Sequence, residues 1–447
     1  MLEGPLFRNI ILYTIPVMLT GVLQLLFNAA DLVIVGRFCG SVSVAAVGAT
    51  GAITNLIVNL FIGLSVGAGV TVAHGLGGED DEVVHRTVHT AVPTAVIAGL
   101  MLAVIGISAA KPVLQWMETP DNVLPLSAVY MQIYFAGMPA SMLYNFCASI
   151  LRAAGDTKSP LKYLTLAGVI NVALNVVFVT QFHMNVAGVA LATIISQAVS
   201  AVLVLRTLMR RTDSCRFEFE KMHIYQPQLM KMIRIGMPAG VQGSMFAISN
   251  VIIQSSINSF GDAVMSGNAA AGNIEGFLYT ALNGFQQAAV NFIGQNVGAG
   301  RYKRVNKIFA VCLGCVTVLG LVGGVGIYLA GETLLGIYIT DSAEAIAHGM
   351  TRLLFVANPY FILGLMDVCT GALRGLGASI SPMIISILGV CGIRIGWIYT
   401  VFQIPQYHTP QCLFVSYIVS WLATFIAQLI AYRVIYKRHT RNIQIAD

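Results

Sequence analysis

Long apolar stretches separated by short polar segments dominate the chain. A helix that crosses a membrane needs about 20 consecutive, mostly apolar residues. The hydrophobic pattern therefore predicts an all-α integral membrane protein with twelve transmembrane helices. They are expected over 10–35, 52–75, 89–110, 127–151, 161–181 and 186–209 in the first half, and over 231–257, 273–297, 306–330, 349–373, 383–403 and 412–436 in the second.

The second half of the chain repeats the first. Arg152 and Gly155 return 222 positions later as Arg374 and Gly377. Further pairs at the same or nearly the same spacing are Pro16/Pro238, Gly21/Gly243, Phe38/Phe260, Pro139/Pro359 and Pro160/Pro382. Because each half has an even number of spans, both enter the membrane from the same side, and a pseudo-twofold axis along the membrane normal relates two six-helix lobes. The predicted division is an N-lobe over 1–209, a cytoplasmic linker over 210–230 and a C-lobe over 231–447.

Composition and charge agree with a membrane protein. Hydrophobic residues make up 57% of the chain and charged residues 10%, against about 25% charged residues in soluble domains. Most of the 25 basic residues fall in segments on one side of the predicted spans, so both termini are expected in the cytoplasm. The net charge of +6 reflects this bias, and no nucleic-acid partner is expected. The first apolar run lacks a cleavage site and is too long for a signal peptide, so it is expected to remain as a span.

The first span carries an acidic side chain. A carboxylate within an apolar transmembrane helix costs at least about 2.5 kcal/mol, which makes Asp31 a candidate functional residue. Gln24, Asn28 and Asp31 recur at i, i+4 and i+7 and share one helical face. Both amides could instead serve as hydrogen-bonding contacts between helices. Pro16 removes one backbone hydrogen bond from the same helix, which predicts a hinge there.

The fifth span carries two amides, Asn171 and Asn175, at i and i+4. Such a pair can coordinate a cation or hold a carboxylate, but buried Asn pairs also serve as structural contacts. If both amides lie close to Asp31 in the folded protein, the functional interpretation is favoured over the structural one.

Motifs for other chemistry are weak. Cys312 and Cys315 lie in an apolar stretch without a neighbouring His or acid, which favours packing over metal binding. His85 and His89 adjoin an acidic loop and are interpreted as part of a solvated helix start. A nucleophile with its base is not apparent, so we expect neither an enzyme nor a bound metal or cofactor.

Three segments together resemble a known family. "NAADLVIVGRFCG", "ILRAAGDTKSP" and "IRIGMPAGVQ" occur in the order and at the spans typical of multidrug and toxic compound extrusion (MATE) transporters. The resemblance covers essentially the whole chain. It implies two six-helix lobes and antiport of protons or sodium ions against bulky, often cationic organic compounds. It also implies a multi-pass protein of the bacterial cytoplasmic membrane.

The resemblance also implies an ion-coupling site in the N-lobe. Matched one at a time, the family's positions fall on Asp31 in the first span, Asn145 in the fourth, Asn171 and Asn175 in the fifth and Thr193 in the sixth. If sodium is the coupling ion, Asp31, Asn171 and Asn175 would hold it. Gln24 occupies the place of a Gln that contacts drug in some relatives.

The C-lobe departs from the pattern of one branch of the family. Phe246 and Leu363 stand where that branch has a Glu and an Asp. Asp367, one turn beyond Leu363, is a secondary candidate acid. Coupling is therefore expected to rest on the N-lobe.

The sequence thus predicts a secondary active multidrug antiporter working by alternating access, most simply as a monomer whose partners are small organic substrates and membrane lipids. The expected substrate contacts are Gln24, Asn28, Gln254, Asn283 and Gln287. An alternative is a lipid-linked oligosaccharide flippase of the same superfamily, which would need cationic cavity groups, and only Arg394 lies well inside a span. The sequence does not distinguish protons from sodium as the coupling ion.

Overall fold

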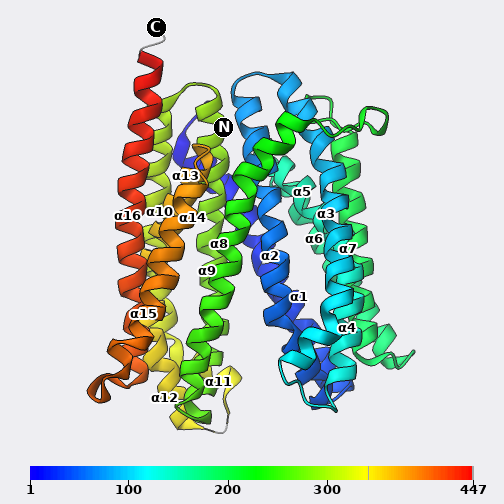
Figure 1. Cartoon of the computed structure of the whole chain (residues 1–447), viewed down its shortest axis with the longest axis vertical. Coiled ribbons are helices and arrows are strands. Elements are labelled where there is room, and N and C mark those ends of the chain that lie inside the picture. Colours follow the sequence, from blue (N-terminus) through cyan, green and yellow to red (C-terminus); the bar gives the residue numbers. More distant parts are fainter. Residues whose placement is uncertain (341, 445–447) are drawn as a thin grey trace. The chain divides into compact units, whose positions relative to one another are not determined.

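The computed structural model describes residues 1–340 and 342–444 (Figure 1). Throughout these residues the regular structure is helical. The chain divides into two compact units, one formed by 19–244 and the other by 1–18 together with 245–447. We call them the N-terminal unit and the C-terminal unit. This division differs from the predicted one at 210–230 in two helices. The first part of α1 (Leu6–Phe38) belongs to the C-terminal unit, and the first part of α8 (Gln226–Asn258) belongs to the N-terminal unit.

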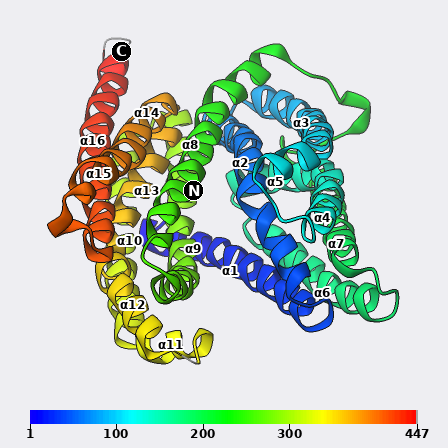
Figure 2. The same cartoon turned by 60° about the horizontal axis from the view of Figure 1, so that its bottom comes forward.

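The N-terminal unit contains the predicted spans one to six. Besides most of α1 and the first part of α8, its helices are α2 (Ser41–Gly77), α3 (Asp81–Trp116), α4 (Leu124–Ala136), α5 (Met138–Ala153), α6 (Lys158–Thr180), α7 (Asn185–Met209) and the short η1 (Phe219–Lys221). Helix α3 packs on α4 and α5, and α6 lies beside α7 (Figure 2). The main apolar core of this unit gathers side chains from α2, α3, α5 and α7.

The C-terminal unit contains the spans of the second half. Its helices are the end of α8, α9 (Asp262–Gly298), α10 (Tyr302–Leu329), α11 (Gly331–Tyr338), α12 (Ala343–Arg352), α13 (Tyr360–Gly375), α14 (Ile380–Ser386), α15 (Ile393–Tyr399) and α16 (Pro410–Gln444). Two π-helical stretches, η2 (Leu353–Ala357) and η3 (Ile387–Gly392), and two short 3-10 turns, η4 (Val401–Gln403) and η5 (Pro405–Tyr407), complete it. The core gathers around α9, α10, α13 and α16.

The repeated prolines and glycines of the two halves occupy matching structural positions. Pro139 lies in the first turn of α5, and Pro359 immediately precedes α13. Proline fits these places because the first helical N–H groups have no intrahelical partner. Gly155 and Gly377 both have positive φ, 91° and 84°, where a residue with a Cβ would be strained. In each half, a proline thus lies at the break within the fourth span, and a glycine with positive φ forms the turn that follows this span.

Each predicted span falls on one helix or on consecutive helices, but their hydropathy differs. Among the described residues, eight helices are long and apolar enough to cross a membrane, or nine if the pair over 343–357 and 360–375, bent by 43°, is one span. Helices α8 and α9 are long enough, at 33 and 37 residues, but carry many amides and small residues. Helices α4 and α5 are separated by Gly137. These three spans, predicted over 127–151, 231–257 and 273–297, are not among those eight or nine.

The first part of α1 is anchored in the C-terminal unit. The Asn291 side chain donates to the Tyr13 hydroxyl (2.7 Å), and the Tyr13 and Phe292 rings meet edge to face at 5.4 Å. In the same way, the first part of α8 packs on α2 within the N-terminal unit. A Cβ at Gly240 would collide with the backbone of Leu60, so glycine is needed for this close helix contact.

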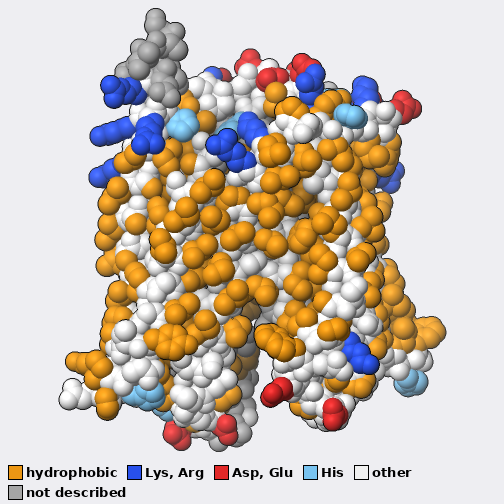
Figure 3. All heavy atoms as spheres, viewed as in Figure 1, with side chains coloured by type: hydrophobic (Ala, Val, Ile, Leu, Met, Phe, Trp, Pro, Cys, Tyr) orange, Lys and Arg blue, Asp and Glu red, His pale blue; other side chains and the backbone are white. Residues whose placement is uncertain are grey.

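The surface of each unit fits a membrane environment. Hydrophobic side chains cover the middle of the visible face of each unit, and most of the visible Lys and Arg side chains lie near one end (Figure 3). Large apolar side chains such as Val104, Val169 and Val322 are more than 60% exposed. Such surface is stable when lipid, rather than water, covers it.

The linker packs against the start of α3. The Glu218 N–H donates to His89 Nε2 (3.1 Å), and the Tyr225 N–H donates to Thr90 Oγ1 (3.0 Å). The Phe217 ring lies tilted against His89, with ring centroids 5.2 Å apart, and His89 is fully buried. The interpretation of His89 as solvated is therefore wrong, because the linker covers it. Among the described residues no group of three or more His, Cys, Asp or Glu side chains is arranged to hold a metal ion.

Candidate functional site

Four of the predicted residues meet in the N-terminal unit, from α1, α6 and α7. Asn175 Nδ2 donates to Asp31 Oδ1 at 2.5 Å and to Asn171 Oδ1 at 3.2 Å. Asn171 Nδ2 in turn donates to Thr193 Oγ1 at 3.3 Å. The Thr193 hydroxyl donates to the Val189 carbonyl of the same helix (3.0 Å). We call Asp31, Asn171, Asn175 and Thr193 the carboxylate–amide cluster.

Packing between α1 and α6 sets this convergence. A Cβ at Gly168 would overlap the ring of Phe27, so the glycine lets α1 approach α6 closely. Asp31 lies four residues after Phe27, and Asn171 lies three residues after Gly168. Because residues three and four apart lie on one helical face, this contact brings the carboxylate level with the amides.

The carboxylate–amide cluster consists of polar side chains in largely apolar surroundings. Asn171 is 5% exposed and Asn175 is fully buried. Next to them lie Ile34, Val35, Val179 and Val189 in one apolar cluster. Both hydrogens of the Asn175 amide are used, but its Oδ1 is buried without a hydrogen-bond partner. An unsatisfied buried acceptor costs about 1–3 kcal/mol, and a small cation or a water could satisfy it.

The chemistry of the donor set suits a small cation. The cluster offers carboxylate, amide and hydroxyl oxygens, which are the ligands that hard cations prefer. A proton would bind the carboxylate directly. Sequence reasoning missed Tyr130 of α4, which lies near enough to Asp31 for an electrostatic interaction and stacks on Tyr134 at 6.2 Å. A lone Tyr in an apolar helix gives no signal for such a role.

The fifth predicted coupling residue lies differently. Asn145 of α5 is half-buried, and its amide donates to the Ser141 carbonyl of the same helix (2.8 Å). Its place in the predicted ion site is therefore not supported by a direct bond to Asp31. On α1, Gln24 and Asn28 are exposed. The role of Pro16 as a hinge stays a prediction, although the boundary between the two units falls two residues after it.

The amides predicted in the second half do not form one group. Gln254 Nε2 donates to Asn258 Oδ1 (2.8 Å), and Gln254 Oε1 accepts from Asn268 of α9 (3.2 Å). Asn283 lies on α9 fifteen residues beyond Asn268, or roughly 22 Å along the helix, and donates to Gln286 (2.7 Å). Gln287 is half-buried and lies one turn beyond Asn283 on the same helical face of α9. Gln254 therefore lies apart from Asn283 and Gln287, and the role of these three side chains in substrate binding stays a prediction.

Gln254 is connected through Asn268 to a buried ion pair between Arg352 and Glu275. Arg352 donates from Nε to Glu275 Oε1 (3.1 Å) and from Nη2 to Oε2 (2.8 Å), and from Nη1 to Asn268 Oδ1 (2.5 Å). The Glu275 side chain is 1% exposed. Glycines bring α9 and α12 together here, since a Cβ at Gly267 would meet the Gly349 backbone. Sequence reasoning missed Glu275, although the rule applied to Asp31, that a carboxylate within a span is functional or paired, would have found it.

Two other charged residues of the C-terminal unit are buried. Asp367 on α13 is 5% exposed, and its Oδ2 has no hydrogen-bond partner. Arg374 and Tyr279 interact with it electrostatically. Arg394 stacks on Tyr417 at 4.0 Å, and its Nε donates to Ser420 (2.9 Å). Arg352 and Arg374, which lie at the two ends of the span predicted over 349–373, are partly buried.

Replacing Gly168 with Leu should disrupt the carboxylate–amide cluster. The larger side chain would push the Phe27 ring away and separate α1 from α6, so we expect transport to fall at least tenfold. Gly48→Leu is the matched control, because a Cβ at Gly48 meets nothing within 4 Å. Initial transport rates, normalised to the amount of folded protein in the membrane, measure the effect. Equal rates for the two variants would contradict the packing argument.

Comparison with known proteins agrees with the internal repeat. A sequence model of the MatE family matches residues 16–177 and again 238–400. The chain is 28% identical over 394 residues to the probable multidrug resistance protein YpnP of Bacillus subtilis, covering 88% of this chain and 87% of that protein. It is 26% identical over 399 residues to the probable multidrug resistance protein YoeA of the same organism, covering 87% and 85%.

Solved structures share the fold. A MOP superfamily transporter from Pyrococcus furiosus superposes with a TM-score of 0.91 at 18% identity, covering 98% of both chains. The outward-facing conformation of a multidrug resistance MATE family transporter superposes with a TM-score of 0.90 at 19% identity, also covering 98% of both chains. The all-helical fold of twelve spans in two lobes is thus that of known MATE transporters. Because the two matches of the family model together cover most of its length, the chain belongs to the MatE family.

Proposed function

We propose that this protein is a secondary active multidrug antiporter that exports bulky, often cationic organic compounds in exchange for protons or sodium ions by alternating access. Family membership supports a multi-pass membrane transporter, and we propose no enzymatic activity for it. The names of its relatives favour multidrug efflux over the flippase alternative. The observation that carries the coupling proposal is the carboxylate–amide cluster around Asp31.

Asp31 is the proposed coupling group. An ionised carboxylate is costly among apolar side chains, and a bound proton or sodium ion would remove most of that cost. Asn175 donates to the carboxylate, and its Oδ1, which has no hydrogen-bond partner, would be available to a bound ion. Ion binding would therefore rearrange hydrogen bonds between α1 and α6. A conformation in which the cluster accepts the ion better is favoured at high ion activity, and this differential affinity is what drives a transport cycle.

Substrate would contact amides that the ion site does not use. Gln24 lies two turns and Asn28 one turn before Asp31 on α1, and Asn283 and Gln287 lie one turn apart on α9. Amides suit varied substrates because they both donate and accept hydrogen bonds. Bending of α1 near Pro16 would couple the ion site to these contacts. Gln254 would act within the polar chain that ends on Arg352.

We further propose that the protein works as a monomer in the bacterial cytoplasmic membrane, with both termini in the cytoplasm and without a bound cofactor or nucleic acid. The bias of basic residues toward one side of the spans supports this orientation. Asp367 is the candidate for a second ion-binding carboxylate.

Transport driven by an imposed gradient tests the proposal. Purified protein in liposomes should move a fluorescent organic cation against its gradient when either a proton gradient or a sodium gradient is imposed in the opposite direction. The gradient that supports transport names the coupling ion. Liposomes without protein, and liposomes with both gradients collapsed by ionophores, are the controls. Transport that ignores both gradients would contradict antiport.

A further inference from the structure

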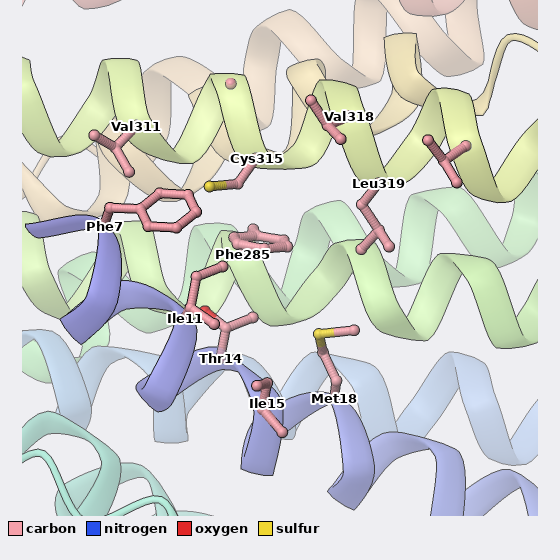
Figure 4. Close-up of a pocket in the computed structure, with 12 residues that line it drawn as sticks. Phe7, Ile11, Thr14, Ile15, Met18, Phe285, Val311, Cys315, Val318 and Leu319 are labelled. Atoms are coloured by element: carbon pink, nitrogen blue, oxygen red, sulfur yellow. The ribbon is translucent and has the colours of Figure 1, made fainter.

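An apolar groove runs along the C-terminal unit outside all the sites described above. It has a volume of about 600 Å³, within the range of about 300–1,000 Å³ typical of small-molecule sites. The first part of α1 forms one wall, α10 the other, and α9 the floor (Figure 4). Representative lining residues are Phe7, Ile11 and Met18 of α1, Phe285 of α9, and Val311 and Val318 of α10.

The groove continues toward a basic end of the same helices. Arg304 lies seven residues before Val311 on α10, on the same helical face and about 10 Å away along the axis. Arg304 Nη2 donates to the Gly4 carbonyl (3.1 Å), and Arg301 Nη1 donates to the Leu2 carbonyl (2.8 Å). Both arginines thus hold the segment that leads into α1. Arg304 Nε is buried and has no hydrogen-bond partner.

The basic end can attract an anion. Lys303 and Lys307 are exposed beside the two arginines, and the first turn of α10 contains no acidic residue. A second hollow of about 440 Å³ opens there, lined by 300–304 together with Tyr436 and Thr440. Positive side chains and an unpaired donor suit a phosphate group, because phosphate accepts charge-assisted hydrogen bonds.

A molecule with an apolar chain and an anionic headgroup matches both the apolar groove and its basic end. We propose that the groove binds an anionic phospholipid, with an acyl chain between α1 and α10 and the headgroup phosphate beside Arg304. The groove lies on helices expected to cross the membrane, and Val318 on its wall is 62% exposed, so a lipid tail can enter from the side. A cationic drug would find the apolar part suitable but would be repelled by the four basic side chains at its end. This site is independent of the proposed transport mechanism.

Native mass spectrometry of the purified full-length protein tests the proposal. Bound lipid is counted after titration with phosphatidylglycerol or with phosphatidylcholine of the same chain length. Gly314→Phe should fill the groove, because Gly314 lines it and a Cβ there meets nothing within 4 Å. Gly326→Phe is the matched control on the same helix, since a Cβ at Gly326 also meets nothing within 4 Å and Gly326 does not line the groove.

We expect the wild-type protein to retain phosphatidylglycerol at least fivefold better than phosphatidylcholine. Gly314→Phe should lower phosphatidylglycerol binding at least fivefold, and Gly326→Phe should leave it unchanged. The double variant Arg304→Gln/Lys307→Gln should reduce the preference for phosphatidylglycerol at least twofold, because two of the four positive charges at the basic end are removed. Thermal unfolding confirms that each variant is folded.

Three outcomes would overturn the proposal. The first is equal binding of both lipids by the wild-type protein. The second is phosphatidylglycerol binding that Gly314→Phe and Gly326→Phe change to the same extent. The third is loss of binding of an organic cation, but not of phosphatidylglycerol, in Gly314→Phe, which would identify the groove as a drug site.

Discussion

Replacing Asp31 with Asn is expected to reduce ion-driven efflux to the level of empty liposomes, a loss of at least 100-fold, while the protein remains folded. The amide keeps the shape of the carboxylate and can still accept a hydrogen bond from Asn175, but it carries no charge and does not take up a proton. Removing the charge from an apolar helix should leave stability unchanged or raise it, because a buried charge is costly. Efflux rates and thermal unfolding of the same preparation separate the two effects.

Asp80→Asn is the matched control for this substitution. Asp80 accepts from the Val83 N–H at the start of α3, and Asn is as good a residue as Asp at this position of a helix. Its transport rate should equal that of the wild-type protein. Undiminished, gradient-driven efflux by Asp31→Asn would remove this carboxylate from the coupling mechanism.

Replacing Arg352 with Met should strongly destabilise the C-terminal unit. The substitution leaves Glu275 buried without its cation, and breaking a buried ion pair from one side costs about 3–5 kcal/mol. We expect a clear fall in the unfolding temperature, measured in detergent, and a lower yield of folded protein. Asn268 would also lose its hydrogen-bond donor.

Two further variants make this prediction specific. Glu275→Gln combined with Arg352→Met should recover most of the lost stability, because no buried charge then remains. Arg86→Met breaks an exposed pair with Glu82, and exposed pairs contribute about 0–1 kcal/mol, so its unfolding temperature should hardly change. If Arg352→Met unfolds at the same temperature as Arg86→Met, Glu275 and Arg352 do not form a stabilising pair.

Much of the fold follows from the sequence, because apolar length and the internal repeat are local properties. The hydrophobic pattern finds α1, α2, α3 and α10 directly. The same pattern predicts α8 and α9 over 231–257 and 273–297, where amides lower the hydropathy and the repeat gives additional support. The breaks before α5 and α13 coincide with Pro139 and Pro359, whose effect on a helix is also local.

The exchange of half-helices between the units could not be predicted in this way. Whether residues 1–18 pack with the first or the second half depends on contacts such as Asn291 with Tyr13, which are 278 positions apart. Hydropathy and periodicity predict where a helix lies in the sequence, but not which other helices it packs against.

The candidate site shows the same limit. Helical spacing places Asn171 and Asn175 on one face, and the cost of a carboxylate in an apolar helix identifies Asp31. That they meet depends on Gly168 and Phe27, which appear in the sequence as ordinary apolar residues. The Arg352 and Glu275 pair is separated by 77 positions, and the spacing of amides did not reveal that Gln254 belongs to it rather than to Asn283.

The most direct test of the account is to record ion influx and substrate efflux at the same time in one liposome preparation. A fluorescent organic cation reports the substrate, and an internal pH or sodium indicator reports the ion. For the wild-type protein we predict that a downhill substrate gradient drives either protons or sodium ions uphill in the opposite direction. In Asp31→Asn, the movement of substrate and the movement of the ion should disappear together. Substrate movement without ion countermovement in the wild-type protein, or persistent countermovement in Asp31→Asn, would contradict the central role of the Asp31 cluster.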